Sequence, residues 1–296
     1  MLKEISERVA QNLGFDKYTV GFIIKPMAGY DMFTSKFILT LSNKKVKERF
    51  MVKIVNSPAF IHYLQNEARS ILRLQNMRIQ GIPSIITCGM NDYRYYIVER
   101  FISGSRAHAS TLAFKEMFGQ VKSWILNVQN RTTVGYFDPR LLLSKAVRYS
   151  ENITEFFDLN DAVYYMERKL PDTTVPLCTV HGDMWHGNIL VDSKNIHLVD
   201  FALSSEAEPP IDILDFIADY QPSILLNAQA LATLCKSLLP PNVDPIFLTF
   251  YSLLRRLSIR VTIAKKLYDQ LLVFNLSTTL NEMKEAGLIK YILMRI

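Results

Sequence analysis

The segment VHGDMWHGNILVDSKNIHLVDF, residues 180–201, carries the most information about this chain. It contains two short apolar runs, NILV and IHLVD, and turn-forming residues 192–195 lie between them. This pattern predicts a β-hairpin. Because a hairpin returns the chain, we expect Asn188 and Asp200 to lie close together at its open end.

The same segment combines two acids and an amide in a pattern that suits metal-assisted chemistry. The oxygens of Asn188 and Asp200 are hard ligands of the kind that Mg²⁺ prefers, and Mg²⁺ usually shares its other positions with water and substrate phosphates. Asp183 precedes Asn188 by five residues, so it could orient a hydroxyl in the same pocket and accept its proton. Asp and Asn are also common turn residues, so the spacing by itself leaves a purely structural interpretation open.

The motif H-G-D-x-x-x-x-N, followed by an apolar strand and D-F, resembles the catalytic and metal-binding loops of the aminoglycoside phosphotransferase and choline kinase-like family. Members of this family are small-molecule relatives of protein kinases. The protein-kinase pattern is H-R-D-x-x-x-x-N and D-F-G, so Gly182 stands in place of Arg and Ala202 in place of Gly.

This resemblance implies a role for each polar residue of the motif. Asp183 would be the catalytic base, Asn188 and Asp200 would bind Mg²⁺, and His181 would support the loop. His186 is not expected to bind a metal, because the family does not need it and no second His lies at ligand spacing.

Lys53 and Glu67 are charged residues in apolar surroundings. Lys53 interrupts the apolar strand FMVKIV, and Glu67 lies on the apolar stripe of the helix predicted after Pro58. Each could lie at an edge that faces water, but a buried carboxylate needs a partner, so we expect an ion pair. The resemblance implies the same pair, in which the lysine contacts the α- and β-phosphates of ATP.

The whole chain predicts an α+β, bilobal protein-kinase-like fold. A small antiparallel sheet with one helix forms an ATP-binding lobe over 1–103, and a larger, mainly helical lobe over 104–296 carries the catalytic loop and the acceptor site. The hinge is expected at Ser103-Gly104-Ser105. The expected strands cover 18–26, 35–41, 49–55, 84–89 and 94–101, and the expected helix has an apolar stripe of Phe60, Leu64, Ala68, Ile71 and Leu72.

Two further segments are expected to contact the nucleotide. KPMAGYDMFTSKF has only Gly29 where a protein kinase has three glycines, but backbone N–H groups near Ala28–Phe33 and the hydroxyls of Thr34 and Ser35 could hold phosphate. YYIVERFISG resembles the linker between lobes, in which the backbone at Glu99 and Phe101 would hydrogen-bond adenine. It equally suits an edge strand that leads to a hinge.

The run ALSSEAEPPIDILDF after Asp200 looks like the family's stretch that ends in G-D-P-x-x-D-L. Asp212 falls in the first turn of a predicted helix, where the helix dipole favours a carboxylate, and we expect it to brace the catalytic loop. Four other acids have two open interpretations, recognition of a cationic substrate or, preferred here, a solvated acidic face: Glu206, Glu208, Asp215 and Asp219.

Composition excludes several other classes of protein. The 296 residues include 34 Lys and Arg against 28 Asp and Glu, a net charge of +6, but no zinc-finger spacing or mixed aromatic and basic motif indicates nucleic-acid binding. Three scattered Cys argue against a disulfide framework or a zinc site. The longest apolar stretch, near 246–254, is too short to span a membrane, and no secretory signal is expected at the N-terminus. A cytoplasmic protein is expected.

These observations predict an ATP- and Mg²⁺-dependent phosphotransferase that moves the γ-phosphoryl group to a hydroxyl of a small molecule. Sugars, amino sugars, amino alcohols such as choline and aminoglycosides are candidate acceptors. Residues 221–296 contain nine basic and four acidic side chains, and Arg255, Arg256 and Arg260 lie close together, which favours a neutral or modestly charged acceptor. An atypical protein kinase and a catalytically silent nucleotide-binding module are the alternatives.

Overall fold

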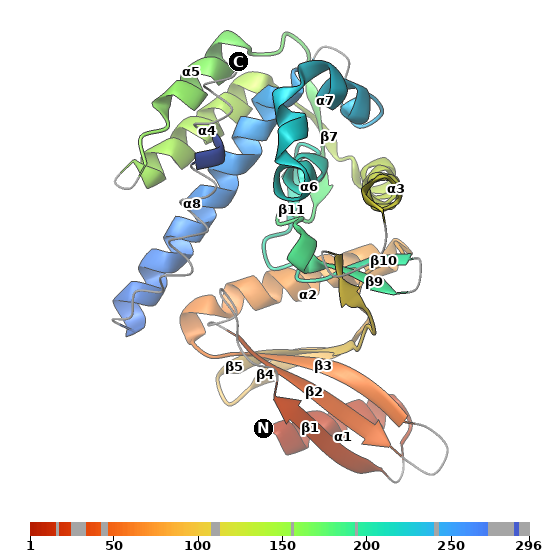
Figure 1. Cartoon of the computed structure of the whole chain (residues 1–296). Coiled ribbons are helices and arrows are strands. Elements are labelled where there is room, and N and C mark those ends of the chain that lie inside the picture. The colour runs from red at the N-terminus through yellow and green to blue at the C-terminus, as the bar shows by residue number, and fades with distance from the viewer. Residues whose placement is uncertain are drawn as a thin grey trace. The chain divides into compact units, whose positions relative to one another are not determined.

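The computed structural model divides into two compact units, each of which is described by itself (Figure 1). The first contains Met1–Leu112 and Gly187–Ser204, and the second contains Ala113–His186 and Ser205–Ile296. The structure describes residues 1–15, 18–24, 34–42, 47–107, 113–154, 157–192, 195–239, 243–271 and 287–289.

A five-stranded antiparallel sheet forms the centre of the first unit, with strand order β1-β2-β3-β5-β4. Its strands are β1 (Thr19–Ile24), β2 (Thr34–Ser42), β3 (Lys47–Val55), β4 (Ile85–Asn91) and β5 (Arg94–Arg100). All five strands predicted from the β-branched and aromatic runs are present, within a few residues of the expected ends.

Helices cover both faces of this sheet (Figure 1). The predicted helix is present as a short η2 (Pro58–Phe60) that continues into α2 (Ile61–Asn76). Leu72 is 39% exposed, so it does not belong to the buried stripe of α2 as the sequence predicted. The structure adds α1 (Leu2–Asn12), whose Ile5, Val9 and Ala10 join the core on the other face of the sheet.

The predicted hairpin, β9 (Ile189–Asp192) and β10 (Asn195–Leu198), belongs to the first unit although it lies far along the chain. The short β6 (Ser105–Arg106) pairs with β9, so Ser105 of the expected hinge is part of a sheet. The first unit therefore differs from the expected lobe of 1–103, because it extends to Leu112 and includes 187–204.

The second unit is mainly helical, as predicted. Its elements are α3 (Phe114–Thr132), α4 (Pro139–Ile153), α5 (Asn160–Arg168), α6 (Asp212–Tyr220), η5 (Pro222–Leu226), α7 (Ala228–Cys235) and α8 (Pro245–Leu271). A small sheet of β7 (Gly135–Phe137), β8 (Val175–Val180) and β11 (Ser205–Glu208) was not predicted. The segment that contains Asp183 leaves the buried strand β8, and η4 (His186–Asn188) follows it. Among the helices described, none is both long and apolar enough to cross a membrane.

Candidate functional site

Lys53 and Glu67 form the buried ion pair that the sequence predicted. The Lys53 Nζ lies 2.6 Å from Glu67 Oε1, and the two residues are only 4% and 2% exposed. Lys53 is on β3 and Glu67 is on α2, so the pair joins the helix to the sheet. The contact of Lys53 with a nucleotide stays a prediction.

Glu99 is a second carboxylate on the same lysine, which the sequence analysis missed. Its Oε1 lies 3.1 Å from Lys53 Nζ, and the residue is 3% exposed. In the sheet register Met51 lies opposite Glu99 and Lys53 opposite Ile97, so alternation places Lys53 and Glu99 on one face. Because this register cannot be read from the sequence, alternation alone did not predict the contact.

The linker segment was expected to use its backbone to bind adenine. In the structure the N–H of Phe101 donates to the carbonyl oxygen of Arg49 at 3.0 Å, so this donor is already engaged within the first unit. Glu99 itself lies inside β5, between β3 and β4. The adenine contact of this segment stays a prediction.

The charges around Lys53 determine its protonation. Burial alone would lower the pKa of Lys53, but the neighbouring carboxylates, Glu67 before Glu99, hold it above its ordinary value, so the ammonium stays charged. Burial raises the pKa of Glu67 to about 7, against the opposing effect of Lys53.

Helix α2 also holds the segment that follows Asp200. Glu67 Oε1 accepts the N–H of Phe201 at 3.1 Å. The neighbouring Asn66 donates to the carbonyl oxygens of Ala202 at 3.1 Å and Ser204 at 2.8 Å. One turn of α2 therefore fixes both Lys53 and the D-F segment. Asn66 carried no sequence signal, because an Asn on a helix is ordinary.

Asn188 and Asp200 flank the open end of the hairpin, as its pattern predicted. Leu198 pairs with Ile189, and the N–H of Val199 donates to the carbonyl oxygen of Asn188 at 2.9 Å. Asp200 has a φ of 70°, in the left-handed region. Such backbone strain in a non-glycine residue costs about 1–3 kcal/mol and is concentrated at functional sites.

Lys36 on β2 is a further cation that the sequence analysis did not select. Its Nζ lies 3.4 Å from Asp200 Oδ2, and in the sheet register Lys36 is directly opposite Lys53. We call Lys36, Lys53, Glu67, Glu99 and Asp200 the lysine cluster. It contains three carboxylates and two ammonium groups, all within the first unit.

The oxygen donors at the hairpin end fit Mg²⁺. Within the residues described, no three His, Cys, Asp or Glu side chains gather as a metal-binding group. Mg²⁺ is typically bound by one or two protein oxygens together with water and phosphates. Asn188 and Asp200 provide one amide and one carboxylate.

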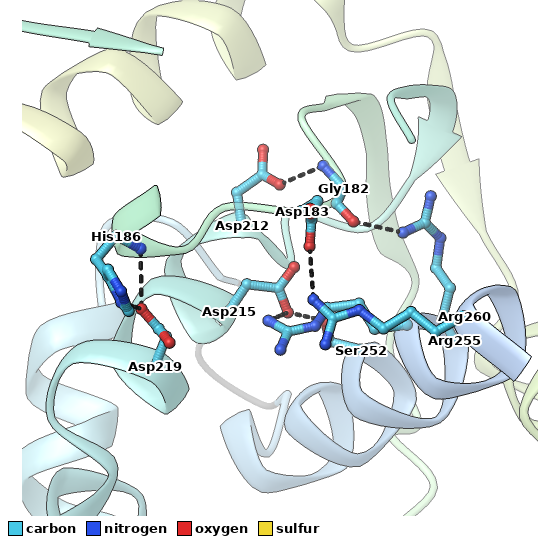
Figure 2. Close-up of polar contacts among 10 residues, drawn as sticks. Gly182, Asp183, His186, Asp212, Asp215, Asp219, Ser252, Arg255 and Arg260 are labelled. Carbon is cyan, nitrogen blue, oxygen red and sulfur yellow. Dashed lines mark hydrogen bonds and ion pairs between the residues drawn. The ribbon is translucent and has the colours of Figure 1, made fainter. Parts of the chain in front are cut away.

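In the second unit, Asp212 holds the backbone that leads to Asp183 (Figure 2). Its carboxylate accepts the N–H groups of His181 at 2.7 Å and Gly182 at 2.9 Å. Gly182 has a φ of 77°, which favours glycine at this position. Burial raises the pKa of Asp212 to about 6, although His181 and these two hydrogen bonds act in the opposite direction. His181 is completely buried.

Helix α8 contacts the same loop through two arginines. Arg260 Nη2 lies 3.2 Å from Asp183 Oδ1, and Arg255 Nη1 donates to the carbonyl oxygen of Gly182 at 3.1 Å (Figure 2). The candidate base is therefore paired with a cation. Arg260 was predicted to be near the acceptor but not to contact Asp183, which precedes it by 77 residues.

The acids of α6 are engaged with protein groups rather than forming a solvated face. Asp215 is completely buried and is bound by the hydroxyl of Ser252 and by Arg256 at 3.4 Å. Asp219 Oδ2 accepts the N–H of His186 at 2.9 Å and lies 2.5 Å from its Nδ1.

Glu208 and Glu206 differ in their exposure to solvent. Glu208 is buried, accepts the Tyr251 hydroxyl at 2.5 Å and lies 3.5 Å from Lys145. The preferred interpretation of a solvated acidic face was therefore wrong for Asp215, Asp219 and Glu208. Glu206 is exposed.

Part of the expected phosphate-binding segment can be located. Ser35 lies on β2 and its hydroxyl donates to Asn56 Oδ1 at 2.6 Å, while Thr34 is buried. The backbone groups of Ala28–Phe33 lie outside the described residues. The role of Ser35 in holding phosphate stays a prediction.

Part of the sequence and the fold of the chain resemble those of known proteins. Residues 127–243, which include the motif from His181 to Asp200, match the sequence profile of the phosphotransferase enzyme family. The chain resembles phosphotransferases, as its motif predicted. A search of curated protein sequences finds no match to the chain.

Many solved structures resemble this chain, among them the following, which match over nearly its whole length. A candidate fructosamine-3-kinase from Haemophilus somnus 129PT is 14% identical with a TM-score of 0.64, and the alignment covers 99% of this chain and 98% of that one. A thermostable mutant of aminoglycoside phosphotransferase APH(4)-Ia, in complex with ADP and hygromycin B, is 11% identical with a TM-score of 0.60 and coverage of 99% and 98%. Choline kinase LicA from Streptococcus pneumoniae is 14% identical with a TM-score of 0.60 and coverage of 98% and 99%. These likenesses confirm the predicted protein-kinase-like α+β fold.

Proposed function

We propose that this protein is a small-molecule kinase, which transfers the γ-phosphoryl group of ATP to a hydroxyl group with the help of Mg²⁺. The observation that carries the proposal is the double contact of Glu67. Its carboxylate binds Lys53, the expected phosphate ligand, and the N–H of Phe201, next to the expected metal ligand Asp200. A purely structural ion pair would not need to fix both groups.

In this mechanism Lys53 would bind the nucleotide phosphates, and Asn188 and Asp200 would hold Mg²⁺. The bound metal ion would neutralise charge on the phosphate oxygens during transfer. Asp183 orients the acceptor hydroxyl and takes its proton while the oxygen bonds to the γ-phosphorus and the bond to the ADP oxygen breaks. Arg260 fixes the position of the Asp183 carboxylate.

The rate of such a reaction comes mainly from positioning and charge stabilisation. The contacts of Asp212 with His181 and Gly182, and those of α8 with Gly182 and Asp183, supply a rigid support for the loop. The nucleotide class is supported by solved neighbours that hold ADP with hygromycin B and GDP with kanamycin.

The charges near Asp183 favour a neutral or modestly charged acceptor. The sequence argument relied on the positive charge of α8, but its arginines lie against acids: Arg260 against Asp183, Arg256 against Asp215 and Arg255 against Glu208. A polycationic acceptor would therefore have to displace an arginine to reach an acid. Sugars, amino sugars and amino alcohols such as choline require no such exchange.

The test is to incubate the purified protein with Mg-ATP and a panel of these acceptors and to identify phosphorylated products by mass spectrometry. We expect a phosphate ester of one small molecule, formed at least about 100-fold more slowly by Asp183→Asn. Phosphorylation of added proteins alone would favour the atypical protein kinase instead. A kcat/KM above about 10⁵ M⁻¹s⁻¹ for an aminoglycoside, a value common among evolved enzymes, would overturn the preferred acceptor class.

A further inference from the structure

The two carboxylates on Lys53 differ in how they are held. Glu67 Oε1 has two donors, the Lys53 ammonium at 2.6 Å and the Phe201 N–H at 3.1 Å. Glu99 has one partner among the residues described, the same ammonium at 3.1 Å. Glu67 is therefore the structural partner of Lys53. Glu99 adds a second buried negative charge, and among the residues described only Lys53 donates a hydrogen bond to it.

A buried carboxylate with one hydrogen bond destabilises the folded state. A role for the charge of Glu99 at Lys53 would offset this cost. With all five side chains ionised, the lysine cluster carries three negative and two positive charges, a net charge of −1. A phosphate group that binds Lys53 is itself negatively charged, so the net negative charge of the cluster repels it. Without the charge of Glu99 the cluster would be neutral.

We propose that Glu99 is a positioning residue that competes with nucleotide phosphates for Lys53 and thereby makes nucleotide binding depend on Mg²⁺. This inference rests on the proposed function. Metal-free ATP carries about two more negative charges than Mg-ATP, so the excess charge of the cluster repels it more strongly. Glu99 thus disfavours unproductive binding of ATP without its metal ion.

The decisive variant is Glu99→Gln, which keeps the shape and a hydrogen-bond acceptor for Lys53 but removes the charge. We expect it to bind metal-free ATP at least about tenfold more tightly than the wild type, the scale of one unit charge about 12 Å away at an effective dielectric constant near 20. The gain for Mg-ATP should be smaller. Isothermal titration calorimetry without an acceptor measures both dissociation constants in the full chain.

Three further variants separate this role from a structural one. Glu99→Asp keeps the charge and should bind metal-free ATP no more tightly than the wild type. Glu67→Gln removes the structural partner and should weaken binding, the opposite sign. Glu48→Gln removes a carboxylate of the same sheet that pairs with Arg100 instead, and should change nothing.

Equal or weaker binding of metal-free ATP by Glu99→Gln, or equal gains with and without Mg²⁺, would overturn the inference while leaving the proposed kinase intact. If the wild type binds ATP under neither condition, the proposed function and the inference are both wrong. Should Glu99→Gln fail to fold, Glu99→Met provides the same loss of charge with an apolar side chain of similar length.

Discussion

Asp183 is the residue on which the proposed chemistry depends most directly. Asp183→Asn removes the proton acceptor but keeps a side chain of the same size opposite Arg260. We expect kcat to fall by about 10²-fold or more, the usual scale for a positioned acid–base group, with nearly unchanged affinity for ATP. Steady-state kinetics and calorimetry with ATP give the two quantities. Asp172→Asn, at an exposed position, is the control with the same change of charge. Wild-type kcat in Asp183→Asn would exclude the mechanism.

Lys53 is expected to affect both stability and nucleotide binding, because it neutralises buried carboxylates and is the proposed phosphate ligand. Lys53→Ala leaves Glu67 and Glu99 buried without their shared cation, and breaking a buried pair in this way typically costs about 3–5 kcal/mol. We expect a lower melting temperature together with a higher KM for ATP. Differential scanning calorimetry and steady-state kinetics measure these effects. Lys47→Ala, at the exposed start of β3, should show neither change. If Lys53→Ala keeps the melting temperature and the KM of the wild type, the pairing is wrong.

At the scale of elements, the pairing of β6 with β9 attaches the hairpin to the rest of the first unit. Gly104 precedes β6, and a Cβ atom there would lie 2.8 Å from the backbone carbonyl oxygen of Val191. Since a backbone atom cannot move aside cheaply, we expect Gly104→Ala to destabilise the protein by about 1–3 kcal/mol, the usual cost of overpacking.

Gly119→Ala is the matched control for this substitution. Gly119 lies inside α3, and a Cβ atom there would meet nothing within 4 Å. This exchange should therefore stabilise the protein by about 0.5–1 kcal/mol through helix propensity. Thermal melts of the two variants should shift in opposite directions. A wild-type melting temperature for Gly104→Ala would mean that the two backbones are not in contact.

Elements with a strong local pattern were predictable from the sequence. The strands of the first sheet and α2 follow from runs of β-branched and aromatic residues and from helical spacing. The first helix was not predicted, although charged and apolar residues alternate in its sequence, LKEISERVAQN. Its buried Ile5 and Val9 show that the same pattern marks an amphipathic helix.

Contacts between distant elements were beyond the sequence alone. Glu99 meets Lys53 across 46 positions and Arg260 meets Asp183 across 77. Such pairs depend on sheet register and helix packing, which composition and spacing do not determine. The buried acids of α6 illustrate the same limit: residues 212, 215 and 219 share one helical face, but only the packed neighbours reveal that this face is internal.

For the whole molecule, buried carboxylates with raised pKa values make stability depend on pH. The pKa of Asp212 is about 6 in the folded protein against an ordinary value of 3.8. Between these values the folded state binds more protons than the unfolded state, so the free energy of unfolding decreases as pH rises. The contribution of Asp212 is fully present below about pH 4 and is lost as pH rises through about 6. Glu67, with a pKa of about 7, acts in the same direction at slightly higher pH.

Asp212→Asn isolates this effect because the amide cannot titrate. Both tryptophans of the chain, Trp124 and Trp185, lie in the second unit with Asp212, so fluorescence-detected urea unfolding reports on that unit. Between pH 4 and pH 7 we expect the wild type to lose on the order of 3 kcal/mol more unfolding free energy than Asp212→Asn, from about 1.4 kcal/mol per pKa unit. Asp172→Asn, whose side chain is exposed, should follow the wild-type curve. Parallel curves for the wild type and Asp212→Asn would contradict a buried, proton-binding Asp212. The slope, rather than the absolute stability of the variant, decides the test, because the substituted amide also changes the hydrogen bonds to the loop at every pH.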